Sequence, residues 1–236
     1  MLALAGCFSS GPSALDDVNR GNAKRDAGDV DGAIAVYSQV LESDAKNAPA
    51  LLNRGIAEVK IDKREGAMAD LNQSILLDPR NSLAYYSRGN LKAILGDFEG
   101  AVADYAKTAA LAESGEEHAD YNRFQFALTL RRLHRDEAPA GLAALVANEQ
   151  PEKWTRLVGR FLTGDLAEPA FLAAAAAGDD KTALLRQCEA YYYAGMTHLL
   201  KNDSLGARDL FNRCLGTGVK SFAVYDLARA EIPRLP

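Results

Sequence analysis

Residue types that commonly carry catalytic or metal chemistry are scarce in this sequence of 236 residues, which has three histidines, three cysteines and one tryptophan. The histidines His118, His134 and His198 are far apart in the sequence. No His-Glu-x-x-His, Cys-x-x-Cys, Gly-x-Ser-x-Gly or glycine-rich phosphate loop occurs. The sequence therefore predicts no catalytic, metal or cofactor site, and we expect a protein that is not an enzyme.

An excess of basic residues is also lacking, because 27 Lys and Arg face 32 Asp and Glu, for a net charge of −5. Proteins that bind nucleic acid use clustered basic residues to neutralise phosphates, so we expect no nucleic-acid partner. The longest run of low polarity, Pro169 to Gly178, falls short of the roughly 20 apolar residues of a membrane-spanning helix. With 48% hydrophobic and 25% charged residues, the composition is typical of one or two packed globular domains.

Near the N-terminus, small and apolar residues precede a cysteine. Leu4, Ala5, Gly6 and Cys7 resemble a lipobox, where a bacterial signal peptide is cleaved and the cysteine is lipidated. The mostly small and polar residues that follow suit a flexible tether. Six residues precede Cys7, without Lys or Arg, whereas a secretory signal has about 15 to 30 with a positive start. Residues 1–13 are thus predicted to be a lipobox remnant and tether, or else the apolar start of a cytosolic protein.

A period of 34 residues runs through the first half of the chain. The columns that share it are Arg20, Arg54 and Arg88; Gly21, Gly55 and Gly89; Ala33, Ala67 and Ala101; and the large apolar Tyr37, Leu71 and Tyr105. A 34-residue unit with Gly at position 8, Ala at position 20 and an aromatic residue or Leu at position 24 resembles the tetratricopeptide repeat. We expect three repeats over residues 14–115, which begin at positions 14, 48 and 82.

The resemblance implies an all-α fold, a right-handed superhelical solenoid of antiparallel helix pairs. We interpret the columns as packing residues, in which Gly on the first helix lets Ala on the second approach and the position-24 residue fills the space beside them. Position 7 is Arg in each unit, and position 23 is Asp in two of them. Two structural ion pairs are therefore predicted, and contacts to a ligand are the alternative. They are Arg54 with Asp70 and Arg88 with Asp104.

Beyond residue 115 the strict period lapses, and we expect irregular helical pairs over residues 116–186. The predicted elements are a helix that ends near His134, one between Pro139 and Pro151, an amphipathic one from Trp154 to Gly164, and a short one from Ala167 to Ala177. Over residues 187–236 the packing columns return as Tyr192, Gly195, Ala207 and Phe211. This segment is predicted to be a degenerate tetratricopeptide repeat followed by a C-terminal capping helix from Val219 to Ile232.

Two cysteines fall at related positions of this last repeat. Gly195 and Ala207 occupy positions 8 and 20, which face one another in antiparallel helices and sum to 28. Cys188 and Cys214 occupy positions 1 and 27, with the same sum. A disulfide is therefore sterically plausible if the protein is exported, whereas two buried thiols are expected if it is cytosolic.

First helices of successive repeats line a concave groove, and positions 2, 5, 6, 9 and 12 face it. The candidate groove residues are Asn22, Arg25, Asn53, Ile56, Tyr86 and Asn90. Their amides could hold the backbone of an extended peptide or protein segment, and a merely solvated surface is the alternative.

One known use of the fold is a clamp that holds a chaperone's C-terminal carboxylate with two Asn and three basic residues. Asn22 and Asn53 match the amide positions of this clamp. Its basic positions are Val18, Leu83 and Ser87. The charges that would bind a carboxylate are therefore missing, so a chaperone co-factor of this type is not predicted.

The C-terminal half also resembles one family of bacterial lipoproteins, new lipoprotein I. The residues that carry the resemblance are Trp154, Phe161, Leu162, Gly164, Tyr192, Gly195, Ala207, Phe211 and Phe222, together with the lipobox. Members are anchored in the outer membrane, are built of tetratricopeptide repeats and bring cell-wall hydrolases to a periplasmic processing protease, commonly as dimers.

This resemblance implies an adaptor or scaffold on the periplasmic face of the cell envelope. Such an adaptor would bind envelope proteins such as a protease or a cell-wall hydrolase in its groove, touch the membrane only through a lipid on Cys7, and could form a homodimer. The alternative is a cytosolic, cytoplasmic assembly or regulatory subunit that uses the same groove without a lipid anchor.

Overall fold

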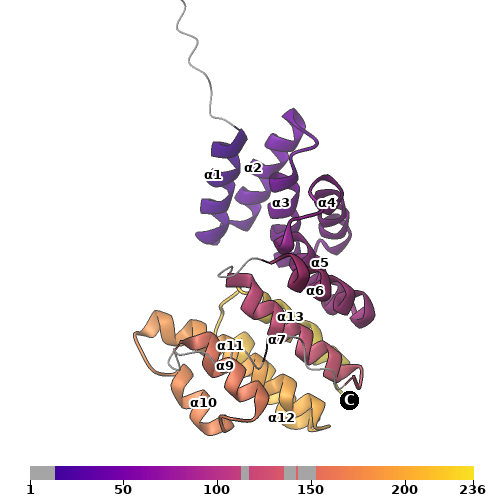
Figure 1. Cartoon of the computed structure of the whole chain (residues 1–236). Coiled ribbons are helices and arrows are strands. Elements are labelled where there is room, and N and C mark those ends of the chain that lie inside the picture. Colours follow the sequence, from indigo (N-terminus) through magenta and orange to yellow (C-terminus); the bar gives the residue numbers. More distant parts are fainter. Residues whose placement is uncertain (1–13, 113–116, 136–141, 143–152) are drawn as a thin grey trace, which may run out of the picture. The chain divides into compact units, whose positions relative to one another are not determined.

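The computed structural model describes residues 14–112, 117–135, 142 and 153–236, and these residues form helices without strands (Figure 1). The expected all-α class is therefore confirmed for this part of the chain. The residues divide into two compact units, with the division between Asp78 and Pro79. We call them the N-terminal unit and the C-terminal unit.

The N-terminal unit consists of two helix pairs. Its helices are α1 (Ala14–Asp26), α2 (Val30–Ser43), α3 (Ala48–Lys60) and α4 (Arg64–Leu77). Side-chain caps fix two of the helix starts: Asp29 accepts a hydrogen bond from the Gly32 amide, and Asn47 accepts one from the Ala50 amide. Asp29 thus caps the start of α2, in the turn that follows α1.

The C-terminal unit contains the remaining helices. They are α5 (Ser82–Leu95), α6 (Phe98–Leu111), α7 (Glu117–Arg132), α9 (Trp154–Thr163), α10 (Glu168–Ala175), α11 (Asp180–Leu200), α12 (Ser204–Gly216), α13 (Ala223–Glu231) and the 3-10 helix η1 (Ile232–Arg234). Among the helices of both units, none has the length and low polarity needed to cross a membrane.

Most of the helix ends lie close to the positions that the sequence predicts. The helix expected to end near His134 ends at Arg132, and His134 follows in a left-handed turn with φ 56°. The amphipathic helix ends at Gly164, whose φ of 89° is readily adopted only by glycine. The helix expected between Pro139 and Pro151 lies outside the described residues.

Each helix pair of the repeat is held together by a glycine that lies directly under the large residue at position 24. A Cβ atom on Gly89 would lie 2.8 Å from Cε1 of Tyr105, and one on Gly195 would lie 2.6 Å from Cε1 of Phe211. The alanine approaches as expected in the second repeat, where a Cβ on Gly55 would lie 3.2 Å from the Ala67 carbonyl oxygen. In the repeats with an aromatic residue at position 24, the ring lies against the glycine. It occupies the space that a Cβ atom would take, which explains why the residue is glycine.

Helix α13 packs on the third repeat as well as on the last one. Besides α12 and α11, helix α13 contacts α5 of the third repeat. The Arg234 guanidinium, which follows α13, donates to the carbonyl oxygens of Ala93 and Ile94 at the C-terminal end of α5. The third repeat is therefore joined to the C-terminal helices, and the compact units divide after residue 78.

Candidate functional site

Four of the six candidate groove residues lie in the N-terminal unit. Asn22 and Arg25 are on α1, Asn53 and Ile56 are on α3, and all four are half-buried. The Arg25 guanidinium donates to Oδ1 of Asn53 at 2.8 Å. Asn53 in turn donates from Nδ2 to the Pro49 carbonyl at 2.9 Å. Arg25 thus ties the first repeat to the second across the face where the sequence places the groove.

The amide of Asn22 turns its oxygen toward α2. The Tyr37 hydroxyl donates to Oδ1 of Asn22 at 2.7 Å. With Oδ1 turned to the tyrosine, the NH2 group of Asn22 lies on the side away from it. Burial is the main cause that raises the pKa of Tyr37, so the hydroxyl remains a donor at neutral pH.

Tyr86 and Asn90, the other two candidates, belong to the C-terminal unit. The Tyr105 hydroxyl donates to Oδ1 of Asn90 at 2.9 Å, and Asn90 is only 6% exposed. Burial raises the pKa of Tyr86 to about 12, and the Glu189 carboxylate of α11 adds to the effect. The α5 face is thus packed against the chain's own helices, so Asn90 offers a partner little surface.

A hydrogen bond joins the residues at positions 9 and 24 of the repeat. It was not predicted from the sequence, although the residue types at these two positions indicate it. Where position 24 is Tyr, position 9 fifteen residues earlier is Asn, as in Asn22 with Tyr37. Asn90 with Tyr105 is the second such pair. Where position 24 lacks a hydroxyl, position 9 is apolar, as in Ile56 before Leu71. Polar and apolar residues therefore change together at these two positions.

The predicted ion pairs both form. Arg54 contacts Asp70 through Nε at 2.6 Å and through a terminal nitrogen at 2.9 Å, and it also donates to the Ser38 hydroxyl. Arg88 makes the same two-point contact with Asp104. In each pair the hydrogen bond to the aspartate is the main cause that raises the pKa of the arginine. The structural interpretation of these residues is confirmed.

The two cysteines of the last repeat lie side by side. Sγ of Cys188 and Sγ of Cys214 are 3.5 Å apart, and both side chains are fully buried. The hydrogen bond with Cys188, together with burial, holds the pKa of the Cys214 thiol well above its usual range. Cys7, the predicted lipidation site, lies outside the described residues.

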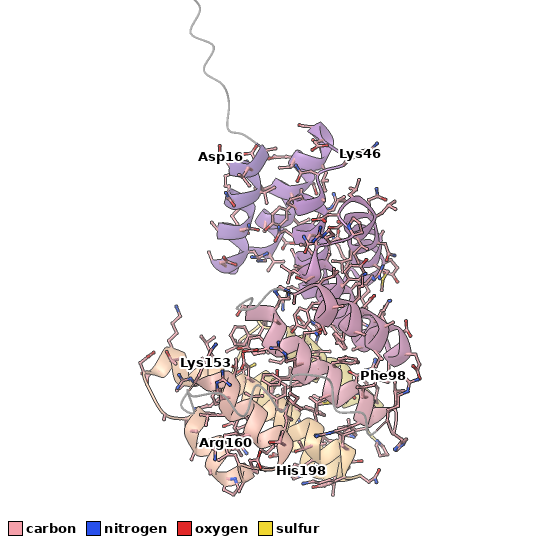
Figure 2. All side chains as sticks on the ribbon, viewed as in Figure 1. Asp16, Lys46, Phe98, Lys153, Arg160 and His198 are labelled. Carbon is pink, nitrogen blue, oxygen red and sulfur yellow. The ribbon has the colours of Figure 1, made fainter. Side chains whose placement is uncertain are left out.

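His198, on α11 and labelled in Figure 2, contacts residues at the starts of α10 and α12. Its Nδ1 lies 2.7 Å from Asp203, which caps the start of α12, and its Nε2 lies 2.9 Å from Glu168, at the start of α10. Burial by itself would lower the pKa of His198, but the hydrogen bonds to Asp203 and Glu168 outweigh burial and raise the pKa above 6.5.

The raised pKa predicts a pH-dependent stability. A histidine that is more basic in the folded than in the unfolded chain stabilises the fold fully below its unfolded pKa of about 6.5, and this contribution is lost as pH rises through the folded value. We expect a lower free energy of unfolding at pH 8 than at pH 6. In the variant His198→Gln this decline should shrink. Urea unfolding followed by Trp154 fluorescence measures the difference, and equal slopes in both proteins would contradict the prediction.

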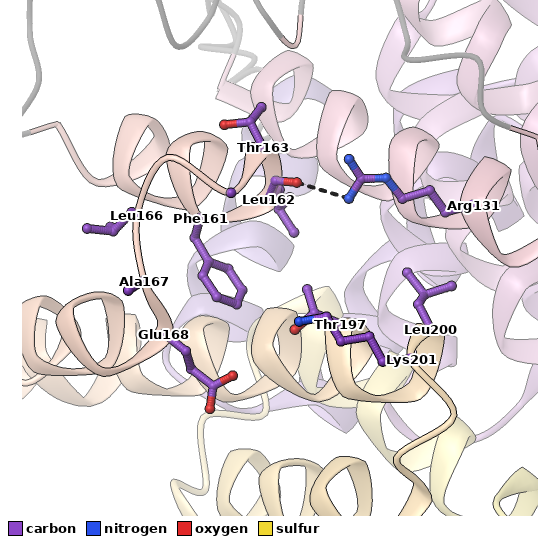
Figure 3. A pocket seen from close by; sticks show the side chains of 11 residues that line it. Arg131, Phe161, Leu162, Thr163, Leu166, Ala167, Glu168, Thr197, Leu200 and Lys201 are labelled. Atoms are coloured by element: carbon purple, nitrogen blue, oxygen red, sulfur yellow. Dashed lines mark hydrogen bonds between the residues drawn. The ribbon is translucent and has the colours of Figure 1, made fainter.

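A cavity of about 410 Å³ opens beside this histidine, between α7, α9 and α11 (Figure 3). Its lining includes Arg131, Phe161, Leu162, Leu166, Leu200 and Lys201. Arg131 reaches across from α7 and donates to the Leu162 carbonyl oxygen at 3.0 Å. Within the described residues, no group of three or more His, Cys, Asp or Glu is arranged to hold a metal ion.

Comparisons with known proteins agree with the repeat. A family model described as TPR repeat matches residues 21–62. A tetratricopeptide repeat protein from Parabacteroides merdae is similar over 94% of this chain and 85% of its own, with 20% identity and a TM-score of 0.56. No curated protein matches the chain.

Two further solved structures are similar at a lower TM-score. The second TPR domain of human RPAP3, in complex with the HSP70 peptide SGPTIEEVD, has 34% identity over 46% of this chain and 90% of its own, with a TM-score of 0.42. YrrB, described as a TPR protein with an unusual peptide-binding site, has 17% identity over 90% of both chains, with a TM-score of 0.47.

Proposed function

We propose that this chain, which has the all-α tetratricopeptide-repeat fold, is a non-catalytic adaptor that binds a segment of a partner protein in the groove of its N-terminal unit. Stacked repeats of this kind present extended concave surfaces to their partners. The observation that carries the proposal is the hydrogen bond from the Tyr37 hydroxyl to Oδ1 of Asn22, which turns the NH2 group away from the tyrosine.

The groove supplies donors in a prearranged geometry. Because Tyr37 occupies Oδ1 of Asn22, the NH2 group of Asn22 is available to a backbone carbonyl of the partner. Asn53 is likewise fixed, by Arg25 and by the Pro49 carbonyl. Donors that are already ordered lose little side-chain entropy on binding, which favours an extended segment with free carbonyl groups.

The groove can be tested by removing one donor without changing the shape of the side chain. Asn22→Asp keeps the oxygen that accepts from Tyr37 and replaces the NH2 group by an acceptor. We expect about a tenfold loss of the partner recovered by crosslinking in the native host, as for one charged or polar hydrogen bond. Gln39→Glu, the same chemical change at an exposed position of α2, is the matched control. Equal recovery with both variants would reject the groove.

We further propose that the adaptor is a lipoprotein of the cell envelope, held to the membrane by a lipid on Cys7. The order Leu4, Ala5, Gly6, Cys7 and the tether after it support this assignment. Its partners would be envelope proteins such as a protease or a cell-wall hydrolase, and it could form a homodimer. Mass spectrometry of the N-terminus after membrane fractionation tests the anchor. An unmodified N-terminus in the soluble fraction would favour the cytosolic assembly subunit.

Export also predicts the state of the buried thiols. In an oxidising compartment, Cys188 and Cys214 would lose two protons and two electrons to a thiol-disulfide oxidoreductase and form a bond of about 2.05 Å. The present distance of 3.5 Å between the sulfur atoms requires only a small shift of α11 against α12. Protein from the native host, denatured without reductant, should take up no alkylating reagent at either cysteine. Labelling of both before reduction would contradict the prediction.

A further inference from the structure

We infer that the cavity between α7, α9 and α11 is a second binding site, which takes the C-terminal residue of a partner polypeptide through its free carboxylate and an apolar side chain. The site lies wholly within the C-terminal unit, apart from the groove of the N-terminal unit. The inference rests on the proposed adaptor function, because it gives the partner a second point of attachment.

The apolar part of the site is the open end of an aromatic stack. The ring of Phe161 lies parallel to that of Phe171, with centroids 4.4 Å apart, and Phe171 stacks in turn on Trp154 at 5.3 Å. Phe161 also lines the cavity, together with Leu166 and Leu200. A stack fixed on one side presents a rigid apolar surface, against which a large side chain can pack with little loss of entropy.

The polar part of the site consists of two cations that retain unused donors. No described residue accepts a hydrogen bond or forms an ion pair with the ammonium group of Lys201. Arg131 uses one guanidinium nitrogen, on the Leu162 carbonyl, and a guanidinium has five N–H donors. Figure 3 shows both side chains at the cavity that they line. Together they can bind one carboxylate by charge-assisted hydrogen bonds.

Among the residues that the structure describes, the nearby carboxylates have partners of their own. Glu168, which lines the cavity, is bound to His198 at 2.9 Å. Asp165, in the neighbouring loop, accepts from the Thr163 hydroxyl at 2.6 Å. Helices α9 and α11 end at the cavity, and their partial negative charge stabilises the cations.

The shape and charge favour a chain terminus over an internal segment. A C-terminal residue carries a carboxylate and an apolar side chain on the same Cα atom, whereas an internal segment has to supply them from two residues, an Asp or Glu and an apolar neighbour. A cavity of about 410 Å³ lies at the small end of the range for ligand pockets, roughly 300–1,000 Å³. It therefore suits a single large apolar residue, such as Phe or Leu, with its carboxylate.

The test uses the full chain and a synthetic probe, acetyl-Gly-Ser-Gly-Phe, as the free acid and as the C-terminal amide. Titration into isotope-labelled protein, followed by amide NMR shifts, should show saturable shifts at Gly164, Thr197 and Lys201 with the free acid. We expect the amide to bind at least tenfold more weakly. Lys201→Gln should weaken binding of the acid about tenfold, and Arg131→Lys, which keeps the charge, should weaken it less.

Lys220→Gln, the same change at an exposed position before α13, is the control and should bind like the parent. Equal binding of acid and amide, or equal loss with Lys201→Gln and Lys220→Gln, would overturn the site. The site would also be overturned if the parent gave no saturable shifts and Lys201→Gln lowered the stability of the fold. Lys201 would then only stabilise the C-terminal end of α11. Asn22→Asp leaves this titration unchanged, so failure of the groove and failure of this site are distinguishable.

Discussion

Replacing Asp104 by alanine is expected to destabilise the C-terminal unit by about 3–5 kcal/mol, the cost of breaking a buried ion pair by removing one partner. The Asp104 side chain is 5% exposed and contacts two cations, Arg88 at 2.7 Å and Lys92 at 2.8 Å. Its removal leaves both positive charges largely buried and without this carboxylate. Chemical unfolding followed by fluorescence of Trp154, the single tryptophan, measures the loss in this unit.

The same change at Asp70 provides a matched comparison in the N-terminal unit. Asp70 is twice as exposed, at 10% of its side chain, and it binds Arg54, whose side chain is 25% exposed. Water can therefore solvate Arg54 after the substitution, and Arg54 keeps its bond to the Ser38 hydroxyl. We expect Asp70→Ala to cost less than Asp104→Ala in unfolding followed by circular dichroism. An equal or larger cost would show that burial of the carboxylate does not set the penalty.

Replacing Gly195 by alanine is expected to cost about 1–3 kcal/mol, even though alanine favours a helix by about 1 kcal/mol over glycine. The added Cβ would lie 2.6 Å from Cε1 and 2.8 Å from Cδ1 of Phe211, whose ring is fully buried. A buried ring cannot move aside, so α11 and α12 must separate or the ring must leave its rotamer. Unfolding followed by Trp154 fluorescence measures this cost.

Two variants separate the overpacking from other effects of the alanine. Gly216→Ala, at the end of α12, meets no atom within 4 Å of its Cβ and should be neutral or slightly stabilising. Phe211→Leu in the Gly195→Ala background copies the second repeat, where Leu71 covers Gly55 and a Cβ on that glycine would lie 3.0 Å from Cγ of the leucine. This second change should recover part of the loss. A double variant as unstable as the sum of both single ones would contradict the packing argument.

The repeat could be predicted from the sequence because its determinants are local and recur. Gly89 and Tyr105 must be a fixed distance apart, since the ring occupies the space above the glycine. The ion pair of Arg88 with Asp104 follows the same spacing, at the preceding residue of each helix. Such pairs lie within one helix hairpin, so the same contacts between nearby residues form in each unit. The residues that make them therefore recur with a period of 34.

Part of the candidate groove followed from the same columns, and part did not. Asn22 and Asn53 lie half-buried on α1 and α3, the first helices of their repeats. The hydroxyl of Tyr37, which orients Asn22, was not recognised, although the spacing of fifteen residues recurs in Asn90 and Tyr105. The packing columns describe the residue at position 24 by its size alone. Its hydroxyl also requires a polar residue at position 9, and size does not show this.

What the sequence by itself determined is therefore the all-α class, the helix pairs and the contacts inside each pair. Tertiary structure alone decided how the C-terminal helices close on the third repeat. Arg234 and Ile94, which meet there, are 140 residues apart, and Arg131 meets Leu162 from a different helix again. Contacts between distant segments follow no period, because each depends on how whole helices pack rather than on spacing along the chain. The cavity between α7, α9 and α11 arises from such packing.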